Sequence, residues 1–121
     1  CGYCKKMDRE TFKDPKVIAY INEHFYPVKF DAEQRKSLRY ADHTFEFDPE
    51  KGRRGVHLLA FALTDGRMSY PSMVYLDESQ KRIAISPGFK PADNFMRELR
   101  FVGDNHYKVT DYNTYVNQGR Q

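Results

Sequence analysis

The sequence of 121 residues predicts a mixed α/β fold, and three observations lead to this prediction. Segments with apolar residues at helical spacing alternate with short segments that are typical of strands. Their order is helix, strand, helix, strand, strand, helix, which is a mixed α/β arrangement. The chain has the length of one domain of roughly 100–150 residues. Its 40% hydrophobic and 15% aromatic residues exclude a disordered or collagen-like protein.

The first part of the chain predicts two helices and a strand. Residues 5–12 are rich in helix formers and contain neither Gly nor Pro. Asp14 is a predicted N-cap, and Pro15 opens a second helix. Its apolar stripe consists of Val17, Ile18, Ile21 and Phe25. The alternation over 26–31 predicts a short strand.

The middle of the chain has the weakest pattern. Residues 31–36 resemble the polar start of a helix, 44–47 an extra edge strand, and 48–55 a loop. A helix is then predicted from Val56 to Leu63, because apolar residues recur there at helical spacing, and Asp65-Gly66 ends it.

The last part predicts a hairpin and two helices. Residues 72–76 and 81–86 are predicted strands joined by a turn at 77–80. Pro91 opens a helix that Gly103 closes, with the stripe Phe95, Met96, Leu99 and Val102. Tyr112, Tyr115 and Val116 predict a short terminal helix.

Charge and hydropathy exclude two classes of partner. The chain carries 20 Lys+Arg against 17 Asp+Glu, a net charge of +3, and the excess is spread out. Nucleic-acid binders usually cluster their basic residues into a patch or stripe. The longest apolar run, residues 58–63, is far shorter than the ~20 residues of a membrane helix. We therefore expect neither nucleic-acid binding nor membrane insertion of this domain.

The only two cysteines form a C-x-x-C motif, Cys1-Gly2-Tyr3-Cys4, directly before a strong helical segment. A thiolate is the nucleophile in disulfide exchange, whereas a free Cys with a pKa near ~8.5 is mostly protonated at neutral pH. A Cys at a helix N-terminus is stabilised as the thiolate by unpaired N–H groups and by the helix dipole. A second Cys one turn later can resolve a mixed disulfide. The spacing therefore favours a redox-active dithiol, with Cys1 and Cys4 as candidate catalytic residues.

Other uses of a C-x-x-C motif fit less well. Zinc sites need four ligands, and the four histidines show no H-x₃₋₅-H spacing, so we expect no metal site. Haem attachment requires a His where Lys5 stands. A lipidated Cys is normally followed by a flexible linker rather than a helix. An inert structural disulfide and a metal-binding dithiol stay open as alternatives, although a four-residue loop gains little from cross-linking.

Several further segments resemble the thioredoxin-like family. They are C-G-Y-C-K-K-M at 1–7 followed by Phe12, V-K-F-D at 28–31, Y-P-S-M-V-Y-L-D at 70–77, and Gly88-Phe89. The resemblance covers most of residues 1–31 and 68–102, and is closest to small exported thioredoxin-related proteins of bacteria. It implies a central mixed sheet flanked by helices. It also implies a cis-proline at Pro71 that, with Tyr70, lies beside the C-x-x-C and holds an extended substrate segment.

The resemblance implies a thiol–disulfide oxidoreductase that acts on protein disulfides or dithiols and exchanges electrons with a partner protein. No cofactor is expected. Cys1 would attack and Cys4 resolve, with Gly2, Tyr3, Tyr70 and Pro71 contacting the substrate. We expect a monomer in the periplasm or otherwise exported, and a cytoplasmic location stays open. A thioredoxin-fold interaction module with little redox turnover is the alternative function.

Two departures from the family pattern stand out. Family members have a central strand before the first Cys, so we expect one incomplete domain over 1–121 and a natural protein that continues upstream. This strand is expected between the 26–30 and 72–76 strands. The chain also carries an insert at about 36–66, whose Gly52-Arg53-Arg54-Gly55 loop could steer an acidic partner.

Overall fold

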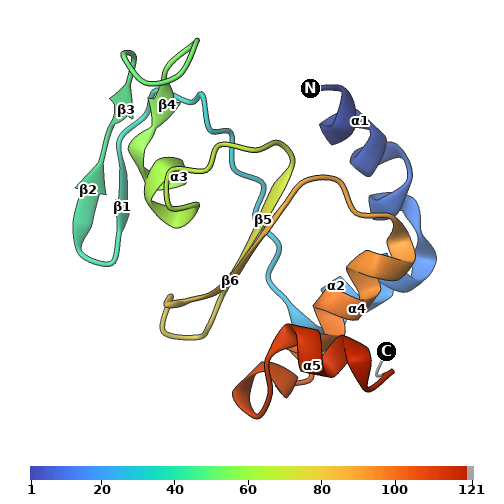
Figure 1. The fold of residues 1–121 in the computed structure, drawn as a ribbon. Coiled ribbons are helices and arrows are strands. Elements are labelled where there is room, and N and C mark those ends of the chain that lie inside the picture. Colours follow the sequence, from blue (N-terminus) through green and yellow to red (C-terminus); the bar gives the residue numbers. More distant parts are fainter. Residues whose placement is uncertain (120–121) are drawn as a thin grey trace. The chain divides into compact units, whose positions relative to one another are not determined.

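The computed structural model describes residues 1–119 (Figure 1). The helices are α1 (Gly2–Arg9), α2 (Pro15–His24), α3 (Leu58–Leu63), α4 (Ala92–Gly103) and α5 (Tyr112–Asn117), with 3₁₀ turns η1 (Thr11–Lys13) and η2 (His106–Lys108). The strands are β1 (Leu38–Tyr40), β2 (His43–Phe45), β3 (Phe47–Asp48), β4 (Val56–His57), β5 (Ser72–Leu76) and β6 (Arg82–Pro87).

The chain forms two compact units. Unit 1 consists of Cys1–Pro27, Tyr70–Met73 and the chain from Pro87 onward, and it holds α1, α2, α4 and α5. Unit 2 consists of Val28–Ser69 and Val74–Ser86. No helix within residues 1–119 combines the length and the apolar character needed to cross a membrane.

The strands pair in three separate two-stranded sheets. β1 and β2 run antiparallel with Leu38 opposite Phe45, and β3 and β4 run antiparallel with Phe47 opposite His57. β5 and β6 form the predicted hairpin. The predicted α/β class is confirmed. A single central mixed sheet, however, is not formed among residues 1–119.

The predicted strand at 26–31 and the predicted helical start at 31–36 are wrong. Residues 26–31 have no regular secondary structure, and the side chains of Tyr26 and Val28 are 99% and 86% exposed. A strand needs a neighbour to pair with its N–H and C=O groups, and residues 26–31 pair with no strand in the described chain. Asp31 instead accepts a hydrogen bond from the Glu33 N–H at 2.9 Å and closes a turn.

The insert contains strands where the sequence pattern was ambiguous. The helix predicted from Val56 begins only at Leu58, because Val56 and His57 pair with β3. The His57 ring is fully buried, and its Nδ1 accepts the Leu59 N–H at 3.2 Å, which caps α3. Its Nε2 lies 2.8 Å from the Lys36 carbonyl oxygen. Because Nδ1 acts as an acceptor, the ring proton is on Nε2, and the Nε2–H group donates a hydrogen bond to this carbonyl.

The core of unit 1 comes from the apolar stripes of its helices. Met7, Val17, Phe95 and Tyr115 are fully buried. The Asp14 carboxylate caps α2 as predicted, accepting the Lys16 N–H at 2.8 Å. The predicted helices at 91–103 and 112–116 are present as α4 and α5. The helix predicted at 5–12 is present in part: α1 begins at Gly2 and ends at Arg9, and Thr11 and Phe12 belong to the 3₁₀ turn η1. Met7 is the buried residue through which α1 belongs to this core.

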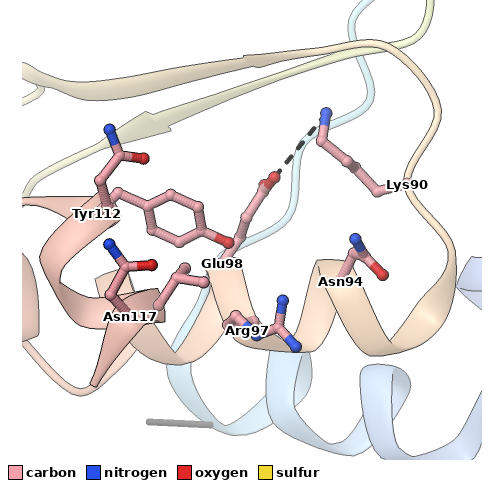
Figure 2. A pocket seen from close by; sticks show the side chains of 8 residues that line it. Lys90, Asn94, Arg97, Glu98, Tyr112 and Asn117 are labelled. Atoms are coloured by element: carbon pink, nitrogen blue, oxygen red, sulfur yellow. Dashed lines mark ion pairs between the residues drawn. The ribbon is translucent and has the colours of Figure 1, made fainter. Parts of the chain in front are cut away.

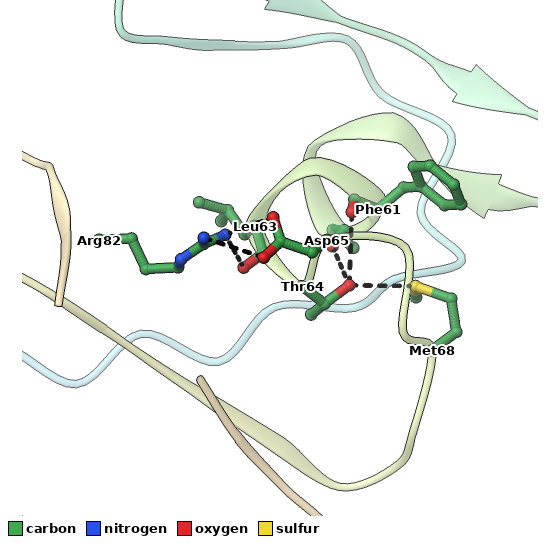
Figure 3. Close-up of polar contacts among 7 residues, drawn as sticks. Phe61, Leu63, Thr64, Asp65, Met68 and Arg82 are labelled. Carbon is green, nitrogen blue, oxygen red and sulfur yellow. Dashed lines mark hydrogen bonds and ion pairs between the residues drawn. The ribbon is translucent and has the colours of Figure 1, made fainter. Parts of the chain in front are cut away.

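The end of α3 is fixed inside unit 2 (Figure 3). Asp65 adopts a left-handed conformation with φ of 55°. Its carboxylate accepts hydrogen bonds from Nη1 and Nη2 of Arg82 at 2.9 and 3.0 Å. Arg82 also donates to the Leu63 carbonyl at 3.1 Å. The Thr64 hydroxyl donates to the Ala60 carbonyl at 2.8 Å. Free carbonyls at the C-terminus of α3 thus find donors within the unit.

Candidate dithiol site

Cys1 is the N-cap of α1, and its Sγ accepts a hydrogen bond from the Cys4 N–H at 3.2 Å. Cys1 is exposed, Cys4 is half-buried, and neither forms a disulfide. One of the orphan N–H groups at the start of the helix therefore points at the sulfur. This contact and the positive end of the helix dipole both favour negative charge on Cys1.

The two residues between the cysteines leave the site open. A Cβ at Gly2 would meet no atom within 4 Å, and the Tyr3 side chain is 62% exposed. Helix α1 has no acidic residue in its first turn. A polypeptide can therefore approach Cys1 without displacing a covering side chain.

Tyr3 lies against the loop that precedes α4. Its ring centroid is 6.3 Å from that of Phe89, with the planes tilted by 39°. The Lys6 ammonium lies 4.8 Å from the centroid of the same Phe89 ring, a cation–π geometry. Phe89 thus contacts two residues of α1 on either side of Cys4.

The same loop also holds the Tyr70–Pro71 segment. The Gly88 N–H donates to the Pro71 carbonyl at 2.7 Å, and Gly88 adopts a φ of 89°, which glycine tolerates best. The Tyr70–Pro71 peptide bond is cis, and the Tyr70 side chain is 44% exposed. The structure therefore connects the predicted site residues within unit 1: Pro71 to Gly88 by a hydrogen bond, and Phe89 to Tyr3 by ring contact.

No group of three or more His, Cys, Asp or Glu side chains is placed to hold a metal ion within residues 1–119. In the insert loop, Arg54 lies 3.8 Å from the Glu33 carboxylate, and both side chains are well exposed. Such an exposed pair contributes little to stability. The part that this loop plays toward an acidic partner stays a prediction.

A sequence model described as a thioredoxin-like domain matches residues 1–103. The chain belongs to the thioredoxin-like domain family. No curated protein and no solved structure gives a significant match. In this thioredoxin-like chain the matched region includes the C-x-x-C helix, all of unit 2 and the part of unit 1 up to the end of α4.

One residue beside the dithiol was not predicted from the sequence as part of the site. Phe89 was noted only within the glycine–aromatic pair that resembles the family pattern. Its contact with Tyr3 depends on how the chain folds back between α1 and the loop before α4. Asp31, the last residue of the V-K-F-D segment, accepts the Glu33 N–H and forms a turn.

Proposed function

We propose that this thioredoxin-like protein is a thiol–disulfide oxidoreductase that exchanges disulfides with protein substrates through Cys1 and Cys4. The observation that carries the proposal is the position of Cys1 as the N-cap of α1, with its exposed Sγ 3.2 Å from the Cys4 N–H. A sulfur in this position is favoured as the thiolate, the form that attacks disulfides.

The exchange proceeds in two balanced steps. The Cys1 thiolate attacks one sulfur of a substrate disulfide, forming a mixed disulfide and releasing the other substrate sulfur as a thiolate. The Cys4 thiolate then attacks the Cys1 sulfur, which forms the Cys1–Cys4 disulfide and releases the second substrate thiolate. Two electrons pass from the dithiol to the substrate, and a partner dithiol protein restores the reduced pair. Each step is reversible, so the same residues serve reduction or oxidation.

In this proposal Gly2, Tyr3, Tyr70 and Pro71 contact the substrate backbone around the scissile disulfide. Three features support this role: the open space at Gly2, the exposure of Tyr3 and Tyr70, and the hydrogen bond that ties Pro71 to the loop contacting Tyr3. No cofactor takes part. We further propose that the protein is monomeric and exported, a setting in which disulfide substrates are common.

The first experiment equilibrates the protein in glutathione buffers of set potential and counts free thiols by alkylation and mass. We expect a reversible two-electron transition between about −270 and −120 mV, the range of known exchange proteins. The Cys4→Ser variant should accumulate a mixed disulfide at Cys1 because the resolving thiol is gone. Cys1→Ser, the matched control, should accumulate none. A pair that remains oxidised well below about −300 mV would mark a structural disulfide and refute the proposal.

An interaction module with little redox turnover is the second candidate function, favoured by the exposed aromatic side chains beside the dithiol. The variant Cys1→Ser/Cys4→Ser separates the two. A binding module keeps its protein partner when both sulfurs are replaced, whereas an exchange enzyme loses its covalent complexes.

A further inference from the structure

A groove of about 400 Å³ lies within unit 1 between α4 and α5 (Figure 2). Its walls carry Asn94, Arg97 and Glu98 from α4, and Tyr112, Asn113, Val116 and Asn117 from α5. The volume falls within the range of small-molecule sites, roughly 300–1,000 Å³. The family match ends at residue 103, so one wall of this groove lies outside the matched region. The groove is thus a feature of this chain that the dithiol chemistry does not use.

Among the described residues that line the groove, two are cationic, Lys90 and Arg97, and one is anionic, Glu98. Lys90 at its edge donates to the Pro87 carbonyl at 2.6 Å and lies 3.9 Å from the Glu98 carboxylate. The Glu98 side chain is only 12% exposed, so this pair is largely internal. Arg97 is half-buried and forms no hydrogen bond or ion pair with any residue between 1 and 119. A half-buried guanidinium without a partner favours an incoming anionic oxygen pair, which it can bind with two parallel hydrogen bonds.

Carboxamides surround this charge. The side chains of Asn94, Asn113 and Asn117 are lining groups of the groove, and within residues 1–119 none of them hydrogen-bonds to another residue. Each carboxamide offers two donors and one acceptor oxygen. This set matches hydroxyl groups, which also donate and accept. It matches an apolar ligand poorly.

An aromatic ring completes the groove. Figure 2 shows the Tyr112 ring extending from α5 toward Glu98. The ring is held in place by an edge contact with Phe101, with centroids 5.2 Å apart. A tyrosine hydroxyl is protonated at neutral pH and can donate a hydrogen bond. Burial first, and then the charge of Glu98, raise the pKa of Tyr112, which extends this behaviour to higher pH. The ring offers a flat apolar surface beside polar groups, as sugar rings require.

We infer that the groove binds a small carboxylate that carries several hydroxyl groups, the chemistry of a sugar acid. The carboxylate pairs with Arg97, and the hydroxyls bind the three Asn carboxamides. A neutral sugar would leave the guanidinium unpaired. A multiply charged phosphate ester would place excess negative charge near Glu98.

The test is a titration of the whole protein with glucuronate, followed by the amide signals in NMR spectra at constant ionic strength. We expect saturable shifts of the side-chain amides of Asn94, Asn113 and Asn117, with glucose and inorganic phosphate binding at least about tenfold more weakly. Arg97→Gln should weaken glucuronate binding by at least about tenfold. Arg100→Gln, on the same helix but outside the groove, should change it by less than about twofold.

A second variant tests the proposal independently in case Arg97→Gln does not fold. Asn113 is exposed in the first turn of α5, where an acidic residue suits the helix, so Asn113→Asp should fold normally. Its added negative charge should also weaken glucuronate binding. The proposal is overturned if glucuronate gives no saturable shift, if glucose or phosphate binds equally well, or if Arg100→Gln weakens binding as much as Arg97→Gln.

Discussion

Gly103 ends helix α4 at its contact with α2, and replacing it with Ala tests how tightly these helices pack. A Cβ there would lie 2.5 Å from the Tyr20 hydroxyl oxygen and 2.9 Å from the ring carbon Cε2. Ordinary contact begins at 3.4 Å, so the ring must move by about 0.9 Å. Tyr20 is held by a hydrogen bond of 2.6 Å from its hydroxyl to Asp104 and by stacking on His24, with centroids 4.1 Å apart.

Two opposing effects determine whether Gly103→Ala raises or lowers the free energy of unfolding. Ala is favoured over Gly within a helix by up to about 1 kcal/mol. Loss of a hydrogen bond to a charged group costs about 1.5–3 kcal/mol. Tyr20 is half-buried, but this hydrogen bond is itself exposed to solvent, which places its loss at the lower end. With the stacking on His24 also disturbed, we expect Gly103→Ala to lower the free energy of unfolding by about 1 kcal/mol, a drop of roughly 3–6 °C in the midpoint.

The assay is thermal and urea unfolding of the reduced protein, followed by circular dichroism, in a double-mutant cycle with Tyr20→Ala. Tyr20→Ala removes the three atoms that lie nearest to the new methyl group, so in that background Gly103→Ala should stabilise by up to about 1 kcal/mol. The sign of the effect therefore reverses between the two backgrounds. Stabilisation by Gly103→Ala in the wild-type background would refute the packing described here.

Three further predictions concern other contacts. Gly55→Ala should destabilise by about 2–4 kcal/mol in urea unfolding, because φ is 81° and the methyl group would overlap the Phe47 ring and nearby backbone. Arg82→Ala should cost about 1 kcal/mol by removing the paired hydrogen bonds to Asp65, and 1 M salt should shrink the difference from wild type; an effect unchanged by salt would argue against an electrostatic origin. Burial, followed by the hydrogen bond to a carboxylate, raises the pKa of Tyr20 above its ordinary value of 10, so folding favours the neutral phenol. The contribution of Tyr20 to the free energy of unfolding should therefore be fully present below pH 10 and be lost as the pH rises further. Tyr20→Phe should make the free energy of unfolding fall less steeply with pH in the alkaline range.

Local chemistry was enough to predict much of unit 1. Asp14-Pro15 begins α2, and Pro91 precedes α4, because capping and proline geometry act within one turn of the chain. The hairpin of β5 and β6, most of which belongs to unit 2, also followed from two short strand patterns around a polar turn. The candidate dithiol depended on a four-residue motif before a helix, and the Cys1 sulfur does cap α1.

Contacts between distant segments determined the features of the fold and the site that the sequence did not predict. The alternating pattern at 26–31 could not make a strand, since a strand exists only where another strand accepts its hydrogen bonds. Val56 and His57 form a strand rather than the start of the predicted helix, because they pair with β3. Tertiary structure alone placed Phe89 on Tyr3 and brought α5 to the side of Arg97. Helix caps and turns are determined by neighbouring residues, whereas sheet pairing, aromatic contacts and grooves require partners that the local sequence does not specify.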